Sequence, residues 1–134
     1  MLPKLSRQDL QQACSREDLI RKTAAQIIKD FAEFGFEIHF SGDVYGFYDE
    51  LFGQMKGHVV QIMGEHYSQF LNFLYRIDVT EEQVIVYQRE MNGVGYEDAL
   101  TELIIHREMK KVMIREYFKA QEKASDNEGK ELLE

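Results

Sequence analysis

The sequence predicts an all-α protein: a single-domain bundle of four or five helices with at most a minor two-stranded element. Apolar residues recur at helical spacing in every long segment, and proline occurs only once in 134 residues. No internal repeat or linker divides the chain. We therefore expect one helical domain over residues 1–123, with its core in residues 16–118 and a charged flexible tail over residues 124–134.

The first predicted helix spans about residues 16–34. Ser15 can act as its N-cap, and Glu17 and Asp18 place negative charge in the first turn. Gly35 follows directly, as expected just beyond a helix C-terminus. The predicted buried side consists of Ile20, Ala24, Ile27, Ile28, Phe31 and Phe34.

Two short segments leave strand and helix as alternatives. Residues 36–40 alternate apolar and polar side chains, and residues 83–87 are rich in β-branched ones, so the two could pair. However, Thr80 and Gln83 have the spacing of a capping box, which favours a helix starting at Glu81. Residues 36–40 are then an extended connector.

A second helix is predicted from Asp43, with a turn or kink near residues 56–58 because Gly53 and Gly57 weaken the helix there. A central helix follows and ends around Arg76. After the break at residues 92–95, a long last helix opens at Tyr96, with acids in its first turn and bases later.

The central segment, Met55 to Ile77, is apolar on two sides. Its first stripe consists of Val59, Ile62, Met63, His66, Phe70, Phe73, Leu74 and Ile77. Its second stripe consists of Val60, Tyr67, Leu71 and Tyr75. Because a surface helix needs only one apolar side, two sides indicate neighbours on both. The last helix of the same chain could cover the second stripe, but we favour a symmetric contact with a second copy, which predicts a homo-oligomer, most simply a dimer.

Charge and composition narrow the function classes. Residues 41–100 carry three bases and ten acids, which would repel phosphate backbones and makes nucleic-acid binding an unfavoured function. The basic residues of the last helix are best explained as a solvated face. The most apolar segment is too polar to cross a membrane, and the single cysteine, Cys14, favours the reducing cytoplasm.

No pattern for catalysis or for a metal is present. Residues 36, 55, 63 and 103, three before each histidine, are not glutamate, so the di-iron motif is absent. The pair Glu102 and His106 has the spacing of an ordinary helix-stabilising contact. We predict no catalytic residue, metal or cofactor.

One set of residues suggests a ligand site. Arg76 and Asp78 end the central helix beside aromatic residues, and an ion pair fixing the turn is the simpler explanation. The alternative is an anchor for a carboxylate or phosphate, because arginine presents a planar fork to such groups. His66 is similarly explained as a core imidazole or, alternatively, as part of the same site.

The string from Leu74 to Val79, together with Leu103 to Phe118, resembles small helical bacterial proteins of no assigned function. That resemblance implies no activity and transfers no site residue. The sequence therefore favours a small, non-enzymatic cytoplasmic interaction or assembly protein. The alternative is a helical-bundle ligand-binding protein or enzyme with a site near His66, Arg76 and Asp78.

Overall fold

The computed structural model describes residues 17–133, with side chains described for residues 17–122. This part of the chain contains five helices and no strand, which confirms the all-α prediction. In order they are α2 (Glu17–Ala32), α3 (Phe47–Glu65), α4 (Tyr67–Ile77), α5 (Glu81–Glu90) and α6 (Tyr96–Leu133). The predictions for residues 1–16 lie outside the described residues.

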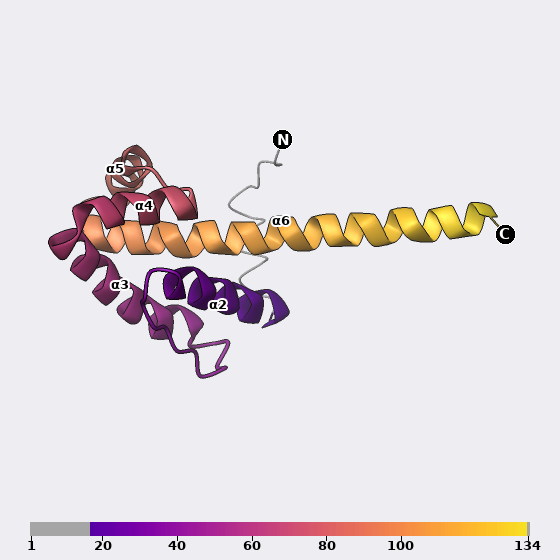
Figure 1. Cartoon of the computed structure of the whole chain (residues 1–134), viewed down its shortest axis with the longest axis horizontal. Helices are drawn as coiled ribbons and strands as arrows, with labels where there is room; N and C mark the ends of the chain where they lie inside the picture. Colours follow the sequence, from indigo (N-terminus) through magenta and orange to yellow (C-terminus); the bar gives the residue numbers. More distant parts are fainter. Residues whose placement is uncertain (1–16, 134) are drawn as a thin grey trace.

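The long helix α6 is the axis of the molecule. In Figure 1, α2 and α3 lie on one side of its first half, α4 and α5 lie on the other, and its second half extends beyond them. Side chains from all five helices form one continuous core around α6. The fully enclosed members include Phe31 from α2, Met55 from α3, Phe73 from α4, Val84 from α5 and Ile104 from α6.

Local sequence signals at two helix ends are confirmed. The first helix ends at Ala32, and Gly35 takes the left-handed conformation at a φ of 79°. Thr80 caps α5: its side chain accepts from the Gln83 backbone N–H at 3.1 Å, and the Gln83 side chain accepts from the Thr80 N–H at 3.1 Å. This capping box settles residues 81–90 as helix rather than strand.

The connector over residues 36–40 is extended without being a strand. Side chains of α3 hold it: the Gln54 amide both accepts from the His39 N–H and donates to the His39 carbonyl, each at 2.8 Å. The Glu50 carboxylate likewise accepts from the Ser41 N–H. These bonds satisfy the connector's backbone as a neighbouring strand would.

Two predicted boundaries are wrong. The second helix starts at Phe47 rather than Asp43, because the Asp43 carboxylate instead accepts from the Tyr45 N–H in a local turn. A turn or kink was predicted near residues 56–58, and the turn is absent because α3 continues as a helix through Gly57 to Glu65. The break lies at His66, with φ −142° and ψ 77°. Buried residues at four-residue spacing from Leu51 to Val59 hold α3 together across both glycines.

Candidate interaction surface and groove

The described part of the chain leaves the second stripe exposed. On α4, Tyr67 is 57%, Leu71 is 43% and Tyr75 is 88% exposed, and Val60 on α3 is 47% exposed. The alternative in which α6 covers these residues is therefore wrong, because α6 packs against the other side of α4. The first stripe is largely confirmed as core, with Phe70, Phe73, Leu74 and Ile77 all buried.

The break at His66 changes the geometry of the second stripe. Val60 now belongs to a different helix from the other three residues, and α3 and α4 diverge on opposite sides of α6 in Figure 1. The residues that share one side of one helix are Tyr67, Leu71 and Tyr75. Together with the exposed Ser68 and Asn72 beside them, they form what we call the α4 face.

The α4 face is uncharged. The sequence of α4 contains a single charged residue, Arg76, although 30% of the chain is charged. Arg76 forms an ion pair with Glu33, just beyond the end of α2, at 2.8 Å. The face is held to α5 by the Tyr67 hydroxyl, which donates to the Glu81 carboxylate at 2.9 Å. This bond raises the pKa of Tyr67, since it stabilises the protonated phenol beside a negative charge.

The structure does not bring His66, Arg76 and Asp78 together as one site. His66 is exposed at the start of α4, so its interpretation as a core imidazole is wrong. The twelve residue steps from His66 to Asp78 separate the two by about 18 Å along α4. Arg76 and Asp78 do not pair with each other either: Asp78, in the left-handed conformation, pairs with Arg107 of α6.

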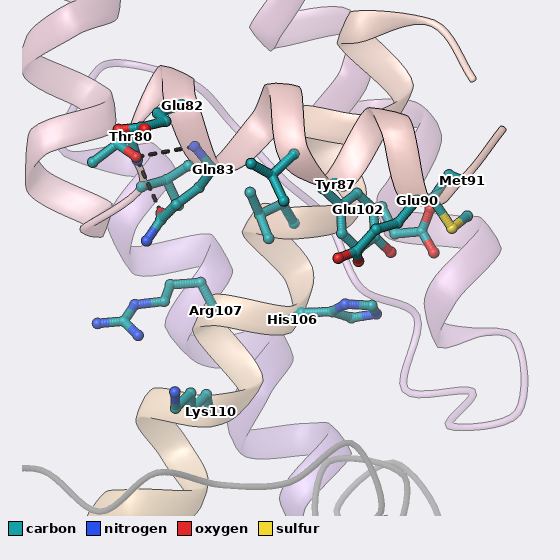
Figure 2. Close-up of a pocket in the computed structure, with 13 residues that line it drawn as sticks. Thr80, Glu82, Gln83, Tyr87, Glu90, Met91, Glu102, His106, Arg107 and Lys110 are labelled. Atoms are coloured by element: carbon teal, nitrogen blue, oxygen red, sulfur yellow. Dashed lines mark hydrogen bonds between the residues drawn. The ribbon is translucent and has the colours of Figure 1, made fainter. Parts of the chain in front are cut away.

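A groove runs between α5 and α6. It has a volume of about 940 Å³ and begins at the α4–α5 loop, where Val79 and Thr80 line it. Figure 2 shows Gln83, Arg107 and Lys110 toward one end and Tyr87, Glu90 and Glu102 toward the other. Its apolar lining consists of Val79, Val86, Tyr87, Met91 and Leu103.

The acidic and the basic side chains that line the groove have different neighbours. Glu102 faces Tyr48 of α3; burial, followed by the charges of Glu102 and Asp49, raises the pKa of Tyr48 to about 12. On the cationic side, one guanidinium nitrogen of Arg107 donates to Asp78, while its Nε is buried without an acceptor. Lys110 has no ion-pair partner among the described residues. The buried polar atom of the groove that lacks a hydrogen-bond partner is therefore a donor, Arg107 Nε.

A second polar cluster lies in the contact between α2 and α6. Glu108 is fully buried, and Lys111 Nζ bridges it to Asp30, 3.2 Å from Glu108 Oε1 and 3.3 Å from Asp30 Oδ2. Gln26 donates to the other Asp30 oxygen at 3.0 Å. The second Glu108 oxygen has no partner when the group is a carboxylate.

The two acids of this cluster differ in protonation. Burial, reinforced by the hydrogen bond to Asp30 and its negative charge, raises the pKa of Glu108 to about 9. Burial also acts to raise the pKa of Asp30, but the hydrogen bonds from Glu108, Lys111 and Gln26 outweigh it, and the pKa of Asp30 is lowered. At neutral pH, Glu108 therefore holds a proton that it donates to the Asp30 carboxylate.

This cluster was not predicted from the sequence, although the sequence contains a signal for it. Glu108 stands four residues from both Ile104 and Val112, and Asp30 three residues from Ile27, so both acids lie on the buried sides of their helices. Glu108 is 0% and Asp30 is 7% exposed, so both acids are enclosed between the two helices. The cluster therefore links α2 to α6, and its acids are not accessible to a ligand.

Among the described residues, no three His, Cys, Asp or Glu side chains converge into a possible metal site. None of the helices described is both long enough and apolar enough to cross a bilayer. No protein-family model, curated protein or solved structure matches the chain.

Proposed function

We propose that this protein is a non-enzymatic cytoplasmic assembly protein that pairs with a second copy of itself through the α4 face. The observation that carries the proposal is the exposure of Tyr67, Leu71 and Tyr75 on one side of a helix whose other side is core. Burying such apolar side chains against a partner is favourable, and contiguous exposed apolar residues are typical of interfaces.

The charge distribution supports a second copy as the partner. In a two-fold symmetric contact each surface meets itself, so any charged residue near the axis lies close to its own like charge. The chain carries a net charge of −8, yet none of the five residues of the α4 face is charged. The side chains that form this face can therefore meet their own copies without like-charge repulsion among themselves.

The substitution Leu71→Glu tests the proposal. We expect the wild-type chain to behave as a dimer in light scattering, and the variant to be a folded monomer, because two buried glutamates would face each other across the axis. Leu71 is 43% exposed within one chain, so the helix content of the variant should stay unchanged.

Two matched variants serve as controls. Gln69→Glu adds the same charge to an exposed position of α4 that is not part of the α4 face, and this variant should remain dimeric. Leu74→Glu places the charge at a side chain that is 3% exposed and should unfold the domain. A monomeric wild-type chain, or a Leu71→Glu variant that keeps the dimer mass, would contradict the proposal.

A further inference from the structure

The groove between α5 and α6 has features that self-association through the α4 face does not explain. Its volume of about 940 Å³ lies in the range of roughly 300–1,000 Å³ that is usual for small-molecule sites. Its walls expose apolar surface: Val86 is 49% and Met91 is 38% exposed. An apolar body of a ligand would bury this surface between the two helices.

One end of the groove offers hydrogen-bond donors that lack acceptors. Lys110 lies three residues after Arg107, so both side chains project from the same side of α6 (Figure 2). Lys110 has no ion-pair partner in the described part, and the Arg107 guanidinium has Asp78 as its one hydrogen-bonding partner there. Across the groove, Gln83 uses its amide oxygen to accept from the Thr80 N–H, which leaves its NH₂ group as a donor.

The acids that line the groove do not accept hydrogen bonds from these donors. Glu82 and Glu90 are exposed to water on α5, and Glu102 faces Tyr48. Figure 2 shows Glu90 and Glu102 toward the end of the groove away from Lys110. The groove therefore has an end with the donors of Gln83, Arg107 and Lys110, where Glu82 lies at the edge beside Gln83, and a far end with Glu90 and Glu102.

We propose that this groove is a binding site for a carboxylate with an aliphatic body. The carboxylate accepts hydrogen bonds from Lys110 and Arg107, as charge-assisted pairs of this kind favour. The aliphatic body lies along Val86 and Leu103. Lys110 and Arg107 would repel a positively charged head group, and a purely apolar ligand would leave both donors without an acceptor.

Calorimetric titration of the full chain with octanoate at neutral pH, well below the concentration at which it forms micelles, tests the site. We expect saturable binding of one octanoate per chain and markedly weaker binding of octanol, which has the same body without the charge. Lys110→Met should weaken octanoate binding roughly tenfold or more, because it keeps the aliphatic stem and removes the charged donor.

Matched substitutions separate the groove from the rest of the surface. Lys119→Met removes the same charge from an exposed position of α6 outside the groove and should leave the affinity unchanged. Val86→Glu should abolish binding, whereas Ile85→Glu, at a neighbouring exposed residue that does not line the groove, should not. Retained helix content in circular dichroism shows that each variant is folded.

Three results would overturn the inference: no saturable octanoate binding, equal binding of octanol and octanoate, or equal effects of Lys110→Met and Lys119→Met. The inference is independent of the proposed assembly, since Leu71→Glu changes the α4 face and leaves the lining of the groove intact. Octanoate should therefore bind that variant with wild-type affinity.

Discussion

Glu108 is the residue at which burial has the largest chemical consequence in this protein. It is enclosed where α2 meets α6, with one oxygen 3.2 Å from Lys111 and the other without a partner as a carboxylate. Holding a proton turns that second oxygen into a donor to Asp30, so the contact contains one negative charge rather than two. Two acids and a lysine can therefore pack between the helices without the repulsion and desolvation of a second buried negative charge.

The raised pKa of Glu108 predicts how the free energy of unfolding depends on pH. The unfolded chain releases the Glu108 proton near pH 4.5, whereas the folded chain keeps it until about pH 9. The stabilising contribution of this group is therefore complete below pH 4.5 and is lost as the pH rises to about 9. The lowered pKa of Asp30 has the opposite effect on stability. The ionised Asp30 carboxylate stabilises the folded state, and this contribution is lost as the pH falls below its unfolded pKa of 3.8.

Glu108→Gln should remove this pH dependence, because glutamine can still donate to Asp30 and cannot ionise. Denaturant unfolding between pH 6 and pH 9 should show the variant more stable than wild type at pH 8 by at least about 1 kcal/mol, since one pKa unit corresponds to about 1.4 kcal/mol. Glu90→Gln, at an exposed acid on α5, is the control and should leave the slope unchanged. An unchanged slope in Glu108→Gln would show that the acid ionises freely.

At the scale of helices, predictions from the sequence were correct where neighbouring residues determine a feature and wrong where tertiary packing determines it. The capping box of α5 involves Thr80 and Gln83 alone, and the sequence predicted it correctly. The continuity of α3 through Gly53 and Gly57 depends on burying Leu51, Met55 and Val59, and the turn that the sequence predicted near residues 56–58 is absent. Glycine costs about 1 kcal/mol in a helix, which the burial of one leucine offsets.

Thr80→Ala tests the contribution of the cap. Removing the side-chain acceptor of the Gln83 N–H should lower the free energy of unfolding by about 1 kcal/mol, measured by denaturant titration. Thr80→Ser retains the hydroxyl and should recover most of the loss. If alanine and serine had the same effect, the hydroxyl would not be what stabilises the start of α5.

At the scale of the whole molecule, α6 connects every other helix of the described chain and then continues past them (Figure 1). The ion pair between Lys22 and Glu116, at 2.9 Å, is near the end of the contact with α2, and residues 117–122 are exposed. The bundle is therefore complete well before residue 124, even though α6 is helical to Leu133.

Deletion of residues 124–134 should consequently leave the melting temperature and the oligomeric mass unchanged. A deletion from residue 113 onward is the comparison: it also removes Met113, the buried Ile114 and the pairing of Glu116, and should destabilise the domain by several kcal/mol. A lower melting temperature or a changed mass in the shorter deletion would mean that the tail contacts the domain or a second copy.

The sequence by itself determined the helical class, most helix ends and the buried sides of the helices, because periodicity, caps and glycine C-termini act within about four residues. Only the tertiary structure decided which surfaces are covered. It left Tyr67, Leu71 and Tyr75 exposed, separated His66 from Asp78, and opened the groove between α5 and α6. It also joined residues as distant as Asp30 and Lys111, 81 positions apart, and Gln26 and Arg115, 89 apart. Such contacts depend on how whole helices pack, and no local pattern in the chain specifies that packing.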